Sequence, residues 1–342
     1  MAHLEKKIKS FKPSFFIPHA IIQAYKTSIH TRNQLSFEEE EITLEDGGKS
    51  TIDWFPLNHK EMEPSTPIVI FILGIFGTTK ARYTQNLVKL IKKKGWKLAI
   101  INRRGFGFSK LKSKVFVPKD EHFDLDYAIT LLSKRFPKTN LYLMGVSSGA
   151  NYSARYLGEV GKNTAIKAYV SISNPFNLCR ISFQMNQSWY YSFFSKLLAK
   201  GMHKVYRRQL RNEFFKERLK ELGFDSNSFY EELLTKNTCW EVDEFITHKL
   251  GNHKDIYEYY DSISSEHHLN KIKTPSLFIN NEEDPICQSK IIPIEKIFLN
   301  KHLKLLLTQR GGHVGFNSGW RMRYWAFETA LDYFSYYQKP VN

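Results

Sequence analysis

The chain has 342 residues, which is enough for one large domain or two small ones. Hydrophobic residues make up 42% and charged residues 25%, as in ordinary globular proteins, so we expect a sizeable core. The formal net charge of +16 would attract polyanions. Lysine and arginine are spread along the sequence, however, with no paired Cys/His spacing and no aromatic RNA-binding signature, so we predict no nucleic-acid partner.

Cysteine usage and hydropathy favour a cytoplasmic protein. Three cysteines lie far apart and any disulfide scheme leaves one unpaired, which indicates a reducing compartment and no zinc site: Cys179, Cys239 and Cys287. The basic N-terminus lacks the apolar stretch of a signal peptide. The longest apolar run, residues 67–77, is about half of what a membrane-spanning helix needs. We therefore expect no transmembrane helix, and at most peripheral contact with an anionic membrane; a general richness in lysine would explain the charge equally well.

The first half of the chain predicts alternating strands and helices. After an N-terminal segment (1–36), two extended segments flank Asp46-Gly47-Gly48 and predict a hairpin within residues 37–55. Apolar runs then predict buried strands at 68–73, 98–101, 141–144 and 168–172. Helical spacing between them predicts helices at 80–94, 123–136 and 149–160. This rhythm is typical of an α/β fold, in which helices cover both faces of a mostly parallel sheet.

The alternation stops after Pro175. Residues 176–261 are rich in aromatic and charged side chains, have helical periodicity and contain no convincing strand. The alternation resumes within residues 262–342, with strands at 276–280 and 303–307 and helices at 289–299 and 319–337. A helical block inserted between strands of one sheet predicts a cap over the carboxyl edge, where ligands bind in open α/β sheets. We therefore divide the chain into a core, 37–175 and 262–342, and a cap insertion, 176–261.

A G-x-S-x-G sequence follows the predicted strand at 141–144. Gly145-Val146-Ser147-Ser148-Gly149 leads directly into a predicted helix, which is the context of a nucleophile elbow. Glycine is needed on both sides because the serine occupies a sharp, strained turn between strand and helix. Only Ser147 has glycine at both positions, so Ser147 is the predicted nucleophile and Ser148 the adjacent residue.

A serine nucleophile needs a histidine base and a carboxylate that orients it, in the chain order serine, acid, histidine for this elbow. His313 lies within Gly311-Gly312-His313-Val314-Gly315 after the last predicted strand and is the predicted base. The acid should follow the strand at 276–280, where Asp284 precedes a turn at Pro285. Asp284 is preferred because its shorter side chain suits a Ser-Asp-His line, and Glu283 is the competing candidate.

Two backbone N–H groups should stabilise the developing oxyanion. Ser148 follows the nucleophile and is the first predicted donor. The loop Gly74-Ile75-Phe76-Gly77 follows the strand at 68–73 and supplies the second, with Ile75 the preferred residue. A plain glycine turn is the alternative reading of this loop.

With these residues placed, the chain resembles AB hydrolase family four, which contains medium-chain esterases, monoacylglycerol lipases and alcohol acyltransferases. The similar segments are Pro18 to Gln23, GKSTIDW at 48–54, NRRGFG at 102–107, WEVDEF at 240–245, and Tyr259-Tyr260 with Ser264-Ser265. The chain departs from the family at the start of the oxyanion loop, at Ser148-Gly149-Ala150, and in lacking an N-terminal anchor. No histidine is followed five residues later by Asp, a spacing found in acyltransferase members.

These features predict an α/β-hydrolase fold with an inserted helical cap and a serine hydrolase activity on carboxylic esters. The acyl-enzyme would form on Ser147, from a medium-chain or monoacylglycerol-type lipid ester, with no metal and no cofactor. Acyl transfer to an alcohol, or a catalytically silent binding module of the same fold, are the alternatives. An epoxide hydrolase or dehalogenase is disfavoured because those enzymes carry Asp at the elbow.

Two features of residues 176–261 carry further expectations. Aromatic side chains are expected to contact the acyl chain: Trp189, Tyr190, Tyr191, Phe193 and Phe194. Residues 196–220 contain nine Lys or Arg and two acids, with apolar residues at near-helical spacing. A basic amphipathic helix of this kind can lie on anionic lipid, with Arg207, Arg208 and Arg211 as contacts. The alternative is an ordinary cap helix whose charges are solvated.

Overall fold

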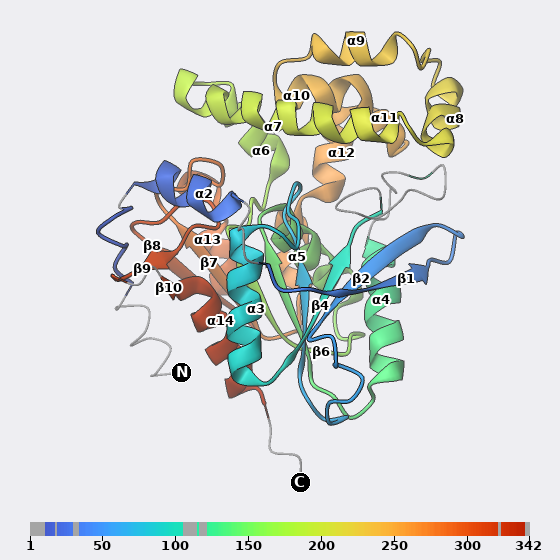
Figure 1. Cartoon of the computed structure of the whole chain (residues 1–342). Coiled ribbons are helices and arrows are strands. Elements are labelled where there is room, and N and C mark those ends of the chain that lie inside the picture. The colour runs from blue at the N-terminus through green and yellow to red at the C-terminus, as the bar shows by residue number, and fades with distance from the viewer. Residues whose placement is uncertain are drawn as a thin grey trace.

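The computed structural model describes residues 11–17, 19–29, 34–104, 115, 122–320 and 323–338. Its centre is an eight-stranded sheet in the order β1-β2-β4-β3-β5-β6-β7-β8 (Figure 1). The strands are β1 (Glu38–Thr43), β2 (Lys49–Phe55), β3 (Ile68–Ile72), β4 (Lys97–Asn102), β5 (Leu141–Val146), β6 (Ile166–Ile172), β7 (Ser276–Asn281) and β8 (Leu303–Thr308). β2 pairs antiparallel with β1 and with β4, and all other pairs are parallel, so the predicted hairpin and the predicted mostly parallel sheet are confirmed.

Helices cover both faces of the sheet, as predicted. One face packs against α3 (Arg82–Lys94) and α14 (Trp325–Tyr336), through side chains such as Leu87 and Phe327. The other packs against α4 (His122–Arg135), α5 (Ser148–Val160) and α13 (Ile294–Leu299), through side chains such as Ile129 and Tyr156. The central strands β3 and β5 are buried along their whole length, which explains why they read as unbroken apolar runs in the sequence.

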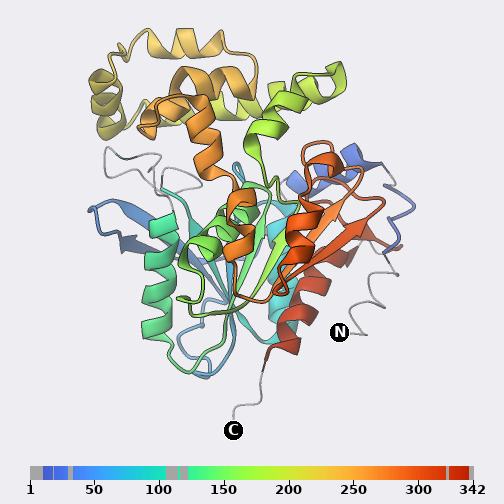
Figure 2. The ribbon, with the colours of Figure 1, turned by 180° about the vertical axis from the view of Figure 1, so that it is seen from behind.

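A block of helices lies beyond the carboxyl edge of the sheet (Figures 1 and 2). Its elements are α6 (Leu178–Met185), α7 (Trp189–Gln209), α8 (Glu213–Glu221), α9 (Phe229–Leu234), α10 (Cys239–Val242), a π-helical turn η1 (Asp243–Thr247), α11 (His248–Leu250) and α12 (Ile256–Ile263). Several begin at polar N-caps whose side chains accept backbone N–H groups: Asn177, Ser188, Asn212 and Asp255. The block has its own apolar core, which includes Met202, Tyr206, Phe215 and Phe229.

Two predicted helices are shorter than the sequence pattern indicated. Residues 289–299 form a 3₁₀ turn, η3 (Ser289–Ile291), and then α13, because Pro293 has no N–H to continue a helix and Ile292 before it is extended. The predicted helix 319–337 begins only at Trp325. Asn317–Ser318 (β9) and Arg323–Tyr324 (β10) instead pair as a short antiparallel ribbon.

The basic stretch 196–220 is also divided. It spans the end of α7 and most of α8, with a break at residues 210–212. Met202, Tyr206 and Phe215 are buried in the core of the helical block, so part of the apolar pattern serves ordinary packing.

The N-terminal segment packs against the loop that carries His313. Ser14 N donates to Asn317 O (2.9 Å), and Asn317 N donates to the Gln23 side chain of α2 (Ala20–Ser28) (3.1 Å). A Cβ at Gly312 would lie 2.3 Å from Ala20 O, so α2 sits directly on the loop's backbone. Pro18 lies outside the described residues. No helix in the described part of the chain is both long and apolar enough to span a bilayer.

Candidate functional site

Ser147 stands at the turn between β5 and α5, with φ 53° and ψ −126°. A Cβ at Gly145 would lie 2.5 Å from Gly149 O, and one at Gly149 would lie 2.4 Å from Ile72 O. Backbone atoms of the neighbouring strand and helix occupy both places, so a larger residue would force the turn open. The two glycines of the motif are therefore required by the close approach of β3 and α5 to this turn.

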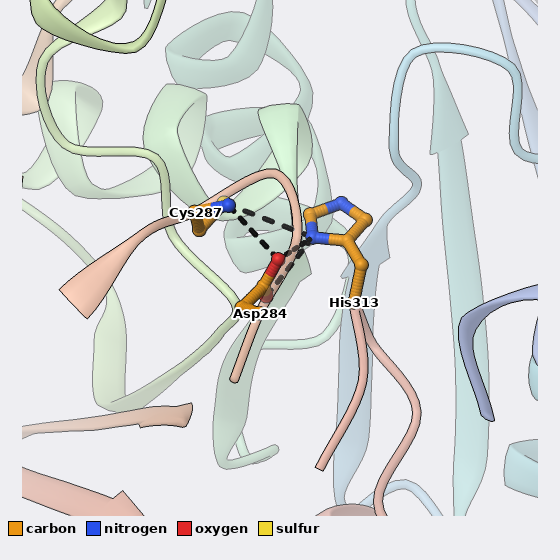
Figure 3. Close-up of side chains that lie close together, drawn as sticks. All are labelled: Asp284, Cys287 and His313. Atoms are coloured by element: carbon orange, nitrogen blue, oxygen red, sulfur yellow. Dashed lines mark hydrogen bonds and ion pairs between the residues drawn. The ribbon is translucent and has the colours of Figure 1, made fainter. Parts of the chain in front are cut away.

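His313 connects Ser147 to Asp284. Its Nε2 lies 2.7 Å from Ser147 Oγ, and its Nδ1 lies 3.1 Å from each carboxylate oxygen of Asp284. Figure 3 shows the ring edge with Nδ1 turned towards Asp284. Val314 N donates to Ser173 Oγ (3.0 Å), which anchors the histidine loop to the end of β6. The structure thus brings together the three side chains that the sequence singled out.

The Asp284 carboxylate is buried and held by its own loop. Its Oδ1 accepts the N–H groups of Ile286 (2.9 Å) and Cys287 (2.8 Å). Burial alone would raise the pKa of Asp284, but the charge and hydrogen bond of His313 and these two N–H groups outweigh burial and lower the pKa below its ordinary value. Glu283, the competing candidate, lies at the surface, with its carboxylate 3.9 Å from Arg310 Nε.

Cys287 is a neighbour that the sequence reasoning did not identify. Its Sγ donates to Ser173 O (3.2 Å) and lies 3.7 Å from His313 Nδ1 (Figure 3). Asp284, Cys287 and His313 therefore present three potential metal-ligand atoms within 4.8 Å of one another. Burial and the Asp284 charge raise the pKa of the Cys287 thiol well above its ordinary value. His313 Nδ1 and the Asp284 carboxylate already lie at hydrogen-bonding distance from each other, so two of the three donor groups have a partner within the site.

The predicted oxyanion donors lie beside Ser147. Ser148 is the first residue of α5, where a backbone N–H has no acceptor within the helix. A Cβ at Gly74 would lie 3.3 Å from Ser147 Cβ, so the loop that contains Ile75 passes next to the serine. The ring of Phe76 packs against α7 at Gly201, where an added Cβ would lie 2.5 Å from the ring.

A cavity of about 420 Å³ contains Ser147 and His313 in its wall. The helical block supplies much of the remaining lining, including Ile181, Leu198, Met202 and Tyr206. None of the five aromatic residues at 189–194 appears among the described lining residues, so the expectation that they contact the acyl chain is not supported. Helical periodicity identified α7 but not the face that α7 turns towards the cavity.

Asp243 is a second residue that sequence reasoning missed. It lies in the π-helical turn η1 and lines the cavity, and Tyr260 donates to its carboxylate (2.8 Å). Burial raises the pKa of Asp243 to about 6. Cys239, Asp243 and Thr247 are spaced four apart and so share one helical face, but other charged residues occur in the same stretch, so the sequence carries no distinctive signal for Asp243.

Two of the family-like segments have identifiable structural roles. Asp53 of β2 accepts a hydrogen bond from Asn102 Nδ2 (2.8 Å), which joins β2 to the end of β4. Arg104 pairs with Asp124 (2.5 Å) and Asp46 (2.6 Å). The glycines at 105 and 107 lie outside the described residues.

Comparison with known proteins supports the expected membership of the α/β-hydrolase fold family. A family model described as the alpha/beta hydrolase fold matches residues 67–318. The embryogenesis-associated protein EMB8 of Picea glauca is 28% identical over 81% of this chain and 61% of its own length. The monoacylglycerol lipase of Saccharomyces cerevisiae is 26% identical over 82% of this chain and 61% of its own length. Human phospholipase ABHD3 is 25% identical over 85% of this chain and 69% of its own length.

The match thus spans about three fifths of the length of the first two of these relatives. Among solved structures, the Pyrococcus furiosus esterase Pf2001 superposes with a TM-score of 0.56 at 17% identity, over 89% of this chain and 92% of its own. That likeness concerns the fold. The sequence match covers most of the chain and both halves of the sheet, so the chain belongs to the α/β-hydrolase fold family.

Proposed function

We propose that this protein is a serine hydrolase that cleaves carboxylic esters, with Ser147, His313 and Asp284 as its catalytic triad. The observation that carries the proposal is the continuous hydrogen-bonded line from Ser147 Oγ through both ring nitrogens of His313 to the buried Asp284, on the wall of a cavity. A serine hydroxyl is a weak nucleophile by itself, and this arrangement supplies both the base and the group that orients it.

In the proposed mechanism, His313 Nε2 takes the proton of Ser147 as Oγ attacks the ester carbonyl carbon. The N–H groups of Ile75 and Ser148 hold the oxyanion, and each donor of this kind contributes roughly 10² to 10³ in rate. His313 then protonates the leaving alcohol and activates the water that releases the acid. Asp284 holds the Nδ1–H tautomer and stabilises the imidazolium.

The substrate we propose is a medium-chain acyl ester of the monoacylglycerol type. The cavity side formed by Ile181, Met185, Leu198 and Met202 is apolar and suits an aliphatic chain. Residues 176–261 would then act as the cap that sets chain preference. The names of the relatives, monoacylglycerol lipase and phospholipase, agree with a lipid ester.

A fluorophosphonate probe tests the nucleophile directly. The parent protein should be labelled once and should hydrolyse p-nitrophenyl esters, and Ser147→Ala should lose both while retaining its melting temperature. Ser148→Ala is the matched control, because its proposed contribution is a backbone N–H that alanine keeps, so labelling should persist. Labelling that survives in Ser147→Ala, or a parent protein that is not labelled, contradicts the proposal.

We also propose that the exposed face of α7 contacts an anionic bilayer. Trp189 is 85% exposed, Phe193 58% and Leu197 56%, and their spacing of four places them on one side of the helix. Lys200 and Lys204 are exposed and continue the same side towards the C-terminus, so apolar and basic groups share one face. Insertion of Trp and Phe beside cations is the pattern of helices that lie in a membrane interface.

This surface lies next to the cavity. Leu197 belongs to the exposed face and also lines the cavity, so a bilayer on this face would lie beside the place where a lipid ester must enter. The three arginines expected from the sequence are also exposed, and the Arg207 guanidinium lies 5.8 Å from the ring of Tyr230. Lys200 and Lys204 directly follow the exposed apolar residues on this face and are the positions chosen for a test.

A further inference from the structure

One face of α5 forms part of the cavity wall. Ser148, Tyr152 and Arg155 follow one another at helical spacing on this face, and all three line the cavity. Arg155 lies about two helical turns beyond Ser147. A cationic side chain therefore stands in the same cavity as the proposed nucleophile, at a distance that a small head group can bridge.

Arg155 is buried without a partner for most of its charge. The residue is 5% exposed, and its Nε and Nη1 make no hydrogen bond. Within the described ranges it forms no ion pair, and Glu159, one turn further along α5, lies 3.3 Å from His268 instead. Buried guanidinium groups are almost always paired, since leaving one without an acceptor is costly. The orphaned donors indicate that an anion belongs here.

Arg103 adds a second positive charge to the same wall. Its Nη2 lies 3.3 Å from Ser148 Oγ, and its guanidinium lies 5.8 Å from the ring of Tyr152. Among the lining residues that the structure describes, Asp243 is the one acid, and it belongs to the helical block rather than to α5. Two guanidinium groups therefore lie on the same wall as Ser148.

We propose that Arg155, assisted by Arg103, binds a phosphate or carboxylate group carried by the alcohol part of the ester. This inference rests on the proposed ester hydrolysis at Ser147. In this arrangement the acyl chain would lie against the apolar residues of the helical block, which leaves the α5 wall for the alcohol part. The planar fork of a guanidinium matches the oxygens of a phosphate or carboxylate with two parallel hydrogen bonds.

The test compares three esters that share one acyl chain: 1-decanoylglycerol, 1-decanoylglycerol 3-phosphate, and the decanoyl ester of glyceric acid. Arg155→Met should lower kcat/KM about 10- to 100-fold for a phosphate or carboxylate ester, as expected when a charged hydrogen-bond pair is lost. The value for neutral 1-decanoylglycerol should stay within about twofold. Whichever anionic ester shows the loss identifies the group that is bound.

Further variants separate a direct contact of Arg155 with the anion from a loss of protein stability and from long-range attraction by the net positive charge. Arg180 is 61% exposed and lies outside the cavity lining, so Arg180→Met removes the same charge and should change none of the three values. Arg155→Met should melt no lower than the parent, because the replaced charge has no partner to lose. Arg155→Lys keeps the charge but not the fork and should lose part of the preference.

Three results would overturn the inference. They are an equal loss on the neutral and anionic esters, no loss on either anionic ester, or the same selective loss in Arg180→Met. If the parent hydrolyses none of the esters and takes up no fluorophosphonate, the proposed function itself has failed. A parent that cleaves 1-decanoylglycerol but shows no effect of Arg155→Met refutes only the anion site.

Discussion

Asp243 allows a quantitative test of how much stability a buried charge removes. The carboxylate is buried on the cavity wall and accepts hydrogen bonds from neutral donors such as Tyr260. In the part of the chain that the structure describes, it forms no ion pair with a cationic side chain. Burial raises its pKa from an ordinary value of 3.8 to about 6. Ionisation is therefore less favourable in the folded protein than in the unfolded chain. This difference corresponds to about 3 kcal/mol, at roughly 1.4 kcal/mol for each tenfold change in proton affinity.

The sign follows from the raised pKa. Stability from protonated Asp243 is fully present below about pH 4 and is lost as the pH rises through about 6, so the full loss applies at pH 7.5. Asp243→Asn has no such titration. Relative to the parent, the variant should therefore gain about 2 kcal/mol of unfolding free energy between pH 4 and pH 7.5. Any hydrogen bond of the carboxyl group that the asparagine amide does not reproduce lowers the unfolding free energy equally at both pH values, so this loss cancels in the comparison.

Urea unfolding at pH 4 and pH 7.5 measures this difference, and melting temperatures should shift in parallel by several degrees. Glu244→Gln is the matched control, because it removes the adjacent acid at an exposed position and leaves the buried carboxylate in place. Asp53, whose pKa burial also raises to about 6, is present in all three proteins and cancels. A constant difference between Asp243→Asn and the parent across this range would refute the reasoning.

Three other predictions follow from the site and the cap. In Asp284→Asn, the N–H groups of Ile286 and Cys287 should bind the amide oxygen, so the amide N–H₂ faces His313 Nδ1 and forces the wrong histidine tautomer. Turnover should fall about 10⁴-fold, whereas the turnover of Glu283→Gln should stay near that of the parent. The reverse ranking would identify Glu283 as the acid. Met202→Phe should shorten the preferred acyl chain in a series of p-nitrophenyl esters, and an unchanged ranking would place the chain elsewhere. Binding to anionic liposomes should be weakened by Trp189→Ala and by Lys200→Glu and should decline with salt, without loss of turnover on a soluble ester; equal binding to neutral vesicles would contradict the proposed surface.

Much of the core could be predicted because its signals are local. The runs that became β3 and β5 are apolar because both faces of each strand are covered, and the glycines around Ser147 reflect contacts made within one turn. Chain order then limited the acid and the histidine to the loops after β7 and β8. These choices needed no knowledge of how distant elements pack.

The arrangement of the helical block, α6 to α12, could not be predicted in the same way. Periodicity predicts that α7 is a helix, but its rotation about its axis depends on packing with α10 and with Phe76, which are remote in sequence. This is why Trp189 and Phe193 are exposed while Met202 faces the cavity. Arg155 could not be singled out from the sequence for the same reason. That its Nε and Nη1 lack hydrogen-bond acceptors depends on the packing of side chains from distant parts of the chain.

The packing of α2 on the histidine loop means that the family-matching stretch is shorter than the part of the chain needed to hold the proposed catalytic histidine in place. The family match begins at residue 67, yet Gly312 rests on the backbone of Ala20, and Gln23 holds Asn317. A fragment trimmed to 67–318 would retain Ser147, Asp284 and His313 but would expose this backbone to water. It would also lose β1 and β2 at one edge of the sheet and α14 on one of its faces. A fragment that lacks only the residues up to 30 should therefore lose activity through disorder at His313, so α2 belongs to the unit that positions this histidine.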